Sequence, residues 1–354
     1  MDILTDIVTT LVSQFQKPTL AFLMGGMMLA ALGSKLEVPA PVYKFIVIVL
    51  LLKVGLGAGM SVREADFMAL LVPALAAAAL GIIIVLIGGF SLGRAKGVSH
   101  MDGMATAGLF GAVSASTLAA GMAMLDSEGI AYEGFIGALY PFMDLAALIT
   151  AIVLAKVAEQ RAEATSVNTD GTMTMGGGGQ SASGFNVDGD MIKSIIIDTM
   201  RSPAISALLL GLAIGLLAQP EQVYKSFYEP LFRGLLSILM LIMGMEAWAR
   251  LSEMRKVAHI YILYGLAAPL LHGALGFGAG MVAHHITGFS AGGVVLLAVM
   301  AASSSDISGP PTLRAALPKA NPSAYVGTST GLGTPVAILS IPLFVALADA
   351  FIGF

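Results

Sequence analysis

Long apolar stretches recur along almost the whole chain, and they constrain its fold more than any single motif. A transmembrane helix needs about 20 mostly apolar residues to cross the hydrocarbon core of a bilayer. Of the 354 residues, 57% are hydrophobic and only 11% are charged. We therefore predict an all-α polytopic membrane protein with ten transmembrane helices. The predicted spans are 18–34, 42–60, 67–93, 101–125, 137–158, 200–218, 231–251, 257–285, 291–316 and 323–352.

The placement of lysine and arginine predicts how these spans are oriented. Most basic residues fall in loops on the same side as the segment between the fifth and sixth spans, whereas Lys17, Arg63, Lys225 and Arg233 fall on the other side. Cytoplasmic loops carry the excess of basic residues in membrane proteins. We therefore expect a multi-pass protein of the inner (plasma) membrane, with both termini outside and the central linker in the cytoplasm.

Two segments lie outside the predicted spans. Residues 1–17 place apolar side chains on one helical stripe and Asp2 and Asp6 on the opposite face, which predicts an interfacial amphipathic helix. Residues 161–193 are polar and rich in glycine and serine, and this composition predicts a flexible cytosolic linker. The chain contains no cysteine, which excludes a disulfide framework or a thiolate site.

The halves on either side of the linker resemble each other, and this predicts an internal repeat over 18–160 and 194–354. Each predicted half contains five spans, so the second copy must enter the membrane upside down. Inverted-topology repeats are typical of secondary transporters. The matched pairs, 185 to 192 residues apart, are Pro18 with Pro203, Gly55 with Gly244, Ser114 with Asp306, Ser116 with Ser308, and Asp144 with Thr334.

Spans four and nine each contain a polar, helix-breaking cluster, and we predict that they form crossed broken helices. In span nine, "SSSDISGPP" offers Ser308 as an N-cap with Pro310 in the first turn, where its missing N–H costs nothing. In span four, "FGAVSAST" places the break at Gly111 and offers Ser116 as the matching N-cap. A bilayer tolerates such breaks only where the backbone is buried in protein or lines a polar cavity.

Inversion would bring the N-termini of the two second half-helices together near the middle of the membrane. Each N-terminus carries about half a positive charge and several unpaired N–H groups, so the pair would attract an anion. The hydroxyls of Ser114, Thr117 and the serines of span nine would offer oxygen ligands to a small cation. Asp144 and Asp306 would supply negative charge, and each needs a partner because a carboxylate inside a span costs roughly 2.5 to 3.5 kcal/mol.

Other interpretations of the polar residues stay open at this point. The small residues of "VSAST" are also typical of close helix packing, whereas the acid and the proline pair of "SSSDISGPP" favour a functional site. Lys53 and Glu246 lie about one turn apart when the repeats are aligned. A structural ion pair between them is as compatible with the sequence as a role in coupling.

Several long motifs resemble the cyanobacterial sodium-dependent bicarbonate transporter family of the SbtA type. They are "TAGLFGAVSASTLAA", "ALYPFMD", "YEPLFRGLLSILMLIMGMEA", "ASSSDISGPPTLRA" and "PSAY". The likeness covers nearly the whole chain except the linker, and Ala302 departs from it by standing where the family has a first serine of four. The resemblance implies a symporter, not an enzyme, that couples bicarbonate import to sodium by alternating access and serves inorganic carbon concentration.

The same resemblance implies an architecture, partners and a site. Spans 3–5 and 8–10 would form a core domain, and spans 1–2 and 6–7 a gate or scaffold domain. The family pattern also implies a homotrimer and a cytosolic PII-like regulatory protein on the cytoplasmic face, although the linker here differs in composition. The sodium candidates are Ser114, Ser116, Thr117, Asp144, Asp306 and Ser308, and the bicarbonate candidates are Phe110, Gly111, Ala112, Ser304, Ser305 and Gly309.

Three other functions fit parts of the sequence. A symporter for another small anion, such as an organic acid, would use the same hydroxyls and amides. Two aspartates on separate spans are also the arrangement of intramembrane aspartyl proteases, but "PFMDLA" and "SSDISGPP" lack the tyrosine-aspartate and glycine-aspartate motifs of those enzymes. A nucleotide-sensing scaffold without transport is suggested only by the linker.

Overall fold

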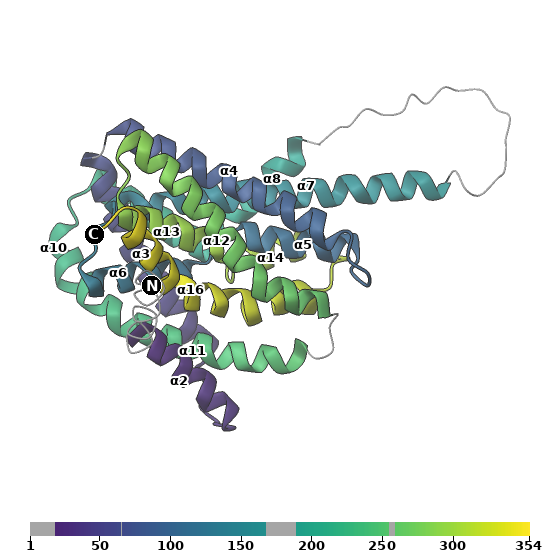
Figure 1. Ribbon diagram of the computed structural model, residues 1–354, viewed down its shortest axis with the longest axis horizontal. Helices are drawn as coiled ribbons and strands as arrows, with labels where there is room; N and C mark the ends of the chain where they lie inside the picture. Colours follow the sequence, from purple (N-terminus) through teal and green to yellow (C-terminus); the bar gives the residue numbers. More distant parts are fainter. Residues whose placement is uncertain (1–17, 65, 168–188, 255–258) are drawn as a thin grey trace.

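The computed structural model describes residues 18–64, 66–167, 189–254 and 259–354, and every regular element in these ranges is a helix (Figure 1). The predicted interfacial helix at 1–17 lies outside the described residues. In the first half the helices are α2 (Pro18–Ala31), α3 (Ala40–Glu64), α4 (Phe67–Leu92), α5 (His100–Gly111), α6 (Ala115–Glu128), η1 (Gly134–Leu139) and α7 (Tyr140–Val167). In the second half they are α8 (Gly189–Met200), α9 (Pro203–Leu217), α10 (Glu221–Val223), η2 (Tyr224–Tyr228), α11 (Glu229–Met254), α12 (His259–Thr287), α13 (Ala291–Ala302), α14 (Gly309–Ala316), α15 (Pro322–Val326), η3 (Gly327–Gly333) and α16 (Thr334–Phe351).

The predicted class of an all-α polytopic membrane protein is confirmed. Within the described residues, seven helices are long and apolar enough to cross a membrane, and α8 with α9 would form an eighth span, bent by 72°. Helices α2 and α13 occupy the first and ninth predicted spans, but they are apolar helices of only 14 and 12 residues. The count of ten spans and their inverted arrangement stay predictions.

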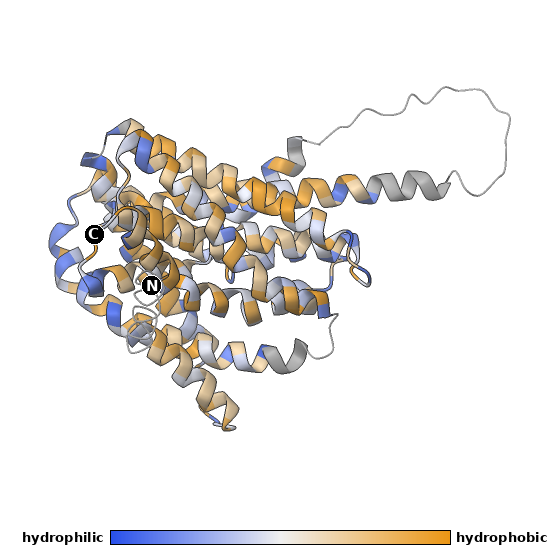
Figure 2. Ribbon diagram, viewed as in Figure 1, coloured by the Kyte–Doolittle hydropathy of each residue, from blue (hydrophilic) through white to orange (hydrophobic). Residues whose placement is uncertain are grey.

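Hydrophobic side chains follow the bodies of the long helices, and hydrophilic residues gather at the two ends of the bundle (Figure 2). Helices α7 and α8 extend into the range predicted as linker, because α7 continues to Val167 and α8 begins at Gly189. The α7 extension begins with Arg161, Ala162, Glu163 and Ala164, which are strong helix formers. Residues 168–188 of the predicted linker lie outside the described residues.

Two close helix pairs, α2 with α11 and α3 with α9, hold one part of the bundle together. Each pair crosses at glycines. A Cβ atom added to Gly211 would lie 2.6 Å from the Leu52 oxygen of α3, and one added to Gly244 would lie 2.9 Å from the Met27 nitrogen of α2. Small residues let helix backbones approach closely in membranes. The glycines facing these two are Gly55 on α3 and Gly26 on α2.

The remaining helices enclose the interrupted segments. Helix α4 packs against α5 and α7, and α12 packs against α13 and α16. All residues of α13 from Gly292 to Ala302 are buried, and 94% of the apolar window across α5 and α6 is buried as well. Their apolar side chains therefore face protein and not lipid, which places the polar breaks in these helices inside the bundle.

Candidate functional site

The first interruption spans residues 112–114, between α5 and α6. Ser114 is the N-cap of α6, and its Oγ accepts a hydrogen bond from the Thr117 backbone N–H at 3.1 Å. The prediction of Ser116 as the N-cap was therefore wrong. Ser116 lies in the first turn of α6, because the break occurs two residues earlier and the Ser114 side chain reaches the third helical N–H, as an N-cap does.

The second interruption spans residues 303–308, between α13 and α14. Ser308 occupies the predicted N-cap position with Pro310 in the first turn, but its side chain caps no backbone N–H of α14. The capping acceptor is Ser305, whose Oγ accepts a hydrogen bond from the Gly309 N–H at 2.8 Å. Ser308 is thereby free to turn its hydroxyl toward α7.

The two interruptions lie in direct contact inside the protein. The Ser114 N–H donates to Ser303 Oγ at 3.0 Å, and the Ser305 N–H donates to the Leu109 carbonyl at 2.8 Å. Ser114, Ser303 and Ser305 are all fully buried. Backbone groups freed by one break are thus satisfied by the other, which is how non-helical backbone is tolerated at membrane depth.

Asp306 joins the two interruptions through its carboxylate. One oxygen, Oδ2, accepts hydrogen bonds from Ser116 Oγ and, at 3.2 Å, from Ser114 Oγ. Thr117 adds a third hydroxyl, because its Oγ1 donates to Ser114 Oγ at 3.0 Å. The other carboxylate oxygen, Oδ1, is buried and has no hydrogen-bond partner among the described residues. A buried carboxylate oxygen without a donor is costly, so this atom calls for a positive partner.

Asp144 forms a second acidic centre on α7, and it is fully buried. Its Oδ1 accepts a hydrogen bond from the Val113 N–H of the first interruption at 3.1 Å. Ser308 Oγ lies 3.2 Å from Asp144 Oδ2 and donates toward it. The Tyr140 hydroxyl lies 3.2 Å from Ser308 Oγ, one helical turn before the acid. Asp144 therefore has protein donors, in contrast to the free oxygen of Asp306.

The bicarbonate candidates of the second interruption contact η3 and α14. Ser304 Oγ donates to the Ser329 carbonyl at 3.1 Å and lies 3.4 Å from Thr334 Oγ1. Ser305 Oγ lies 3.0 Å from Ser308 Oγ. The N–H of Gly309 is occupied by its bond to Ser305 Oγ, so it is not an open donor. This side of the cluster is a connected set of hydroxyls.

The bicarbonate candidates of the first interruption are buried and mostly apolar. Gly111 and Ala112 are buried at the end of α5. The Phe110 ring makes edge contacts with Tyr264 at 5.0 Å and His272 at 6.2 Å between ring centroids. The His272 side chain is fully buried, and neither ring nitrogen has a partner among the described residues. These rings form an aromatic wall beside the break.

The structure brings all the predicted site residues onto the two interruptions and the adjoining turns of α5, α6, α7 and α14. Sequence reasoning missed Tyr140 and Ser329 as polar neighbours. Tyr140 stands four residues before Asp144, and this helical spacing was a usable signal because it places both on one face. Ser329 belongs to the run "GTSTGLG", which forms the π-helix η3. Its contact with Ser304 joins residues that are 25 positions apart, so the local sequence pattern could not predict it.

The suggested ion pair between Lys53 and Glu246 does not form. Lys53 lies over the rings of Phe232 at 4.2 Å and Tyr224 at 5.8 Å, and its electrostatic neighbours are Asp126, Glu229 and Arg233. Glu246 instead interacts with Arg250 and Asp306. Lys53 contacts Phe232 near the start of α11, whereas Glu246 lies near the end of α11, close to Tyr43 at the start of α3, so the two residues are at opposite ends of the α3–α11 contact.

Comparison with known proteins gives one clear result. No curated protein matches the sequence. The sequence model of the family described as "Na+-dependent bicarbonate transporter superfamily" matches residues 18–349. This range includes every helix named above except the last two residues of α16. The match covers both interruptions together with Asp144 and Asp306. The chain belongs to the Na+-dependent bicarbonate transporter superfamily.

Proposed function

We propose that this protein is a symporter that imports bicarbonate together with sodium by alternating access. Sodium-dependent bicarbonate transport is the activity of its family. The coupling, the site and the transport cycle go beyond family membership. They are supported by the chemistry of the two interruptions, above all by the carboxylate of Asp306.

The main support for the proposal is that the two carboxylate oxygens of Asp306 differ in their hydrogen bonding. Two serine hydroxyls donate to Oδ2, whereas Oδ1 is buried without a donor among the described residues. A sodium ion bound at Oδ1 would offset the cost of burying this charge. Ser114, Ser116 and Thr117 would add neutral oxygen ligands, which suit a hard cation better than nitrogen or sulfur ligands do.

Asp144 and Ser308 form the adjoining part of the proposed sodium region. Asp144 already accepts from the Val113 N–H and from the Ser308 hydroxyl. These bonds hold the first interruption against α7 and α14, so Asp144 would position the site and contribute negative charge. Asp306 would be the direct ligand on which sodium affinity mainly depends.

The N-terminus of α6 is the proposed anion donor. Ala115 and Ser116 occupy its first two positions, whose N–H groups have no acceptor within the helix. The N-terminus of α14 has fewer free N–H donors for an anion. Pro310 and Pro311 have no N–H, and the Gly309 N–H donates to Ser305 Oγ. Bicarbonate would therefore bind against α6, with Phe110, Gly111, Ala112, Ser304, Ser305 and Gly309 around it.

Electrostatics explains why the two ions would travel together. Moving one negative charge inward against an inside-negative potential costs about 2.3 kcal/mol per 100 mV. A sodium ion in the same cycle removes this cost, and its concentration gradient then drives uptake. Bound sodium at Asp306 would also neutralise the carboxylate that otherwise repels an anion.

The glycine contacts support the proposed inverted repeat of ten spans. Gly26 and Gly211 are separated by 185 residues and Gly55 and Gly244 by 189, the offsets found between the two halves. Exchanging the halves converts the α2–α11 contact into the α9–α3 contact. Helices α2, α3, α9 and α11 would form the gate domain, and the helices around the interruptions would form the moving core.

The resemblance extends the proposal to assembly and physiology. We expect a homotrimer in the plasma membrane, regulated from the cytoplasm by a PII-like protein and serving inorganic carbon concentration. Both termini would lie outside, as the distribution of basic residues predicts.

Uptake into proteoliposomes tests the proposed function. Purified protein is reconstituted, and labelled bicarbonate uptake is measured at alkaline pH with an inward sodium gradient or an equal potassium gradient. Transient accumulation above equilibrium is expected only with sodium, and competition by small organic anions tests the choice of substrate. Equal uptake with either cation would contradict sodium coupling, and stronger competition by an organic acid than by unlabelled bicarbonate would reassign the substrate.

A further inference from the structure

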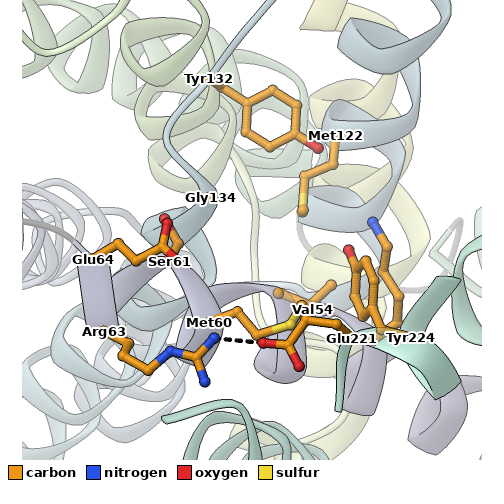
Figure 3. A pocket seen from close by; sticks show the side chains of 12 residues that line it. Val54, Met60, Ser61, Arg63, Glu64, Met122, Tyr132, Gly134, Glu221 and Tyr224 are labelled. Atoms are coloured by element: carbon orange, nitrogen blue, oxygen red, sulfur yellow. Dashed lines mark hydrogen bonds and ion pairs between the residues drawn. The ribbon is translucent and has the colours of Figure 1, made fainter. Parts of the chain in front are cut away.

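Two cavities outside the site described above share the residues Lys53, Tyr132 and Tyr224. Their volumes are about 340 and 490 Å³. They lie between α3, α6 with its following loop, and the segment from α10 to α11, so both core and gate helices line them. Figure 3 shows the smaller cavity, with Tyr132 and Met122 facing the Arg63–Glu221 pair across it.

Lys53 is the unusual charge in this region. Lys53 lies in the middle of α3, away from both helix ends, and only 6% of its surface is exposed. The ammonium lies 4.2 Å from the Phe232 ring centroid, and among the described residues no carboxylate forms an ion pair with it. Aromatic faces stabilise such a cation only partly. A buried ammonium that borders a cavity without an ion-pair partner is suited to bind an anion.

Some of the other charged groups around the cavities have partners of their own. Arg63 forms an ion pair with Glu221 at 2.5 Å. The Tyr132 hydroxyl donates to Asp126 Oδ1 at 2.9 Å, and burial together with the Asp126 carboxylate raises the pKa of Tyr132, so the phenol stays a donor.

Glu229 and Arg233 also line the larger cavity. They stand four residues apart on α11 and carry opposite charges, so together they add no net charge to the cavity lining. Lys53 is thereby left as the positive charge shared by both cavities.

Lys53 lies on the same helix as Tyr43, a residue close to the second interruption. Tyr43, on the same helix, interacts electrostatically with Asp306. Ten residues of helix separate Tyr43 from Lys53, or about 15 Å. The cavities thus lie toward the Glu64 end of α3, which the distribution of basic residues places outside.

We infer that Lys53 forms an outer access site where a small oxyanion binds before it reaches the buried interruptions. The anion is bicarbonate if the proposed function holds, and the inference rests on that function for this identity alone. Phe232 and Tyr224 hold the ammonium in place through contacts with their ring faces. Lys53 would therefore raise the local concentration of anion and not contribute to sodium binding.

The absence of native cysteine makes a direct test possible. Met122 lines the smaller cavity with Lys53, and Met122→Cys introduces a single thiol there. In intact cells, labelling rates are compared for an anionic sulfonatoethyl and a cationic trimethylammonioethyl methanethiosulfonate. Adding Lys53→Gln should lower the anionic-to-cationic rate ratio at least about threefold, whereas Lys53→Arg should preserve it. Millimolar bicarbonate should slow labelling only where the charge at position 53 is kept.

Lys225→Gln is the matched control, because Lys225 is an exposed lysine on η2 close to Tyr224. It should leave the ratio and the protection unchanged. An unchanged ratio in Lys53→Gln, or equal protection by bicarbonate with and without the lysine, would overturn the access site. Charge-dependent labelling in a protein that fails the proteoliposome assay would support the anion site while refuting the proposed transport.

Discussion

The two interruptions lie at matching positions of the repeat predicted from the sequence, yet they differ in length and in chemistry. The first has three residues and ends at an N-cap serine, Ser114, whose side chain caps α6. The second has six residues, contains Asp306, and leads into α14 through two prolines. One break thus leaves a helix end with open N–H groups, and the other leaves a carboxylate with an open oxygen.

This difference supports the proposed division of roles between the two interruptions. The N-terminus of α6 offers donors for an anion, whereas the segment before α14 offers acceptors for a cation. Because the Ser114 N–H is bonded to Ser303 and its hydroxyl donates to Asp306, the two centres share residues. Binding of either ion would therefore directly affect the affinity of the site for the other.

The largest expected effect comes from removing the charge of the second interruption. Asp306→Asn should raise the sodium concentration for half-maximal uptake about thirtyfold, as expected for losing about 2 kcal/mol of charge-assisted interaction. Asp349→Asn, at an exposed position near the end of α16, is the control and should transport normally. A wild-type sodium response in Asp306→Asn, with normal folding, would reject the assignment of the cation to this break.

Removing a donor from the first interruption tests the other role. Ala115→Pro deletes the first N–H of α6, and proline is compatible with the first position of a helix. Half-saturation by bicarbonate should rise about tenfold at saturating sodium, since a hydrogen bond to a charged group contributes about 1.5 kcal/mol. Ala291→Pro, at the first position of α13, makes the same change away from the site and should leave bicarbonate affinity unaltered.

Asp144→Asn should have a smaller effect than Asp306→Asn. An asparagine oxygen still accepts from the Val113 N–H, so the bond that holds the first interruption survives. We expect about a threefold increase in the sodium requirement, because the charge lost already has protein donors. The sodium requirement is measured by titrating bicarbonate uptake with sodium. An increase larger than that of Asp306→Asn would reverse the proposed ranking of the two acids.

The smallest effects come from the two capping serines. Ser114→Ala and Ser305→Ala each remove a side-chain cap and should destabilise the protein by about 1 kcal/mol in thermal unfolding. Only Ser114→Ala should also weaken sodium dependence, because only Ser114 reaches the Asp306 carboxylate. Identical sodium titrations for the two variants would remove Ser114 from the proposed cation site.

Much of the bundle was predictable because apolar length and helix-breaking residues are local signals. Hydropathy predicted the all-α membrane class and the long apolar helices, and the proline pair predicted the start of α14 with Ser308 at its N-cap position. The choice of Ser116 over Ser114 failed because two serines two residues apart give the same capping signal. Which one caps depends on where α5 ends, and that is decided by packing against Asp144 and Ser303.

The partners of isolated charges were not predictable for a different reason. Aligning the repeats placed Lys53 near Glu246. In the structure, Lys53 instead lies over the Phe232 ring, and Glu246 lies near Asp306. Such contacts depend on how α3 and α11 cross, which a linear offset does not encode. The capping role of Ser305 and the free oxygen of Asp306 likewise arise from three-dimensional contact between the breaks.

Equilibrium binding of radioactive sodium to the purified protein tests the central proposal most directly. Binding is measured for the wild type and for Asp306→Asn, with and without bicarbonate. We predict saturable sodium binding to the wild type that bicarbonate tightens, and in Asp306→Asn about thirtyfold weaker sodium binding that bicarbonate no longer tightens. Sodium binding that is the same in the variant, or that bicarbonate does not alter in the wild type, would contradict a shared site at the two interruptions.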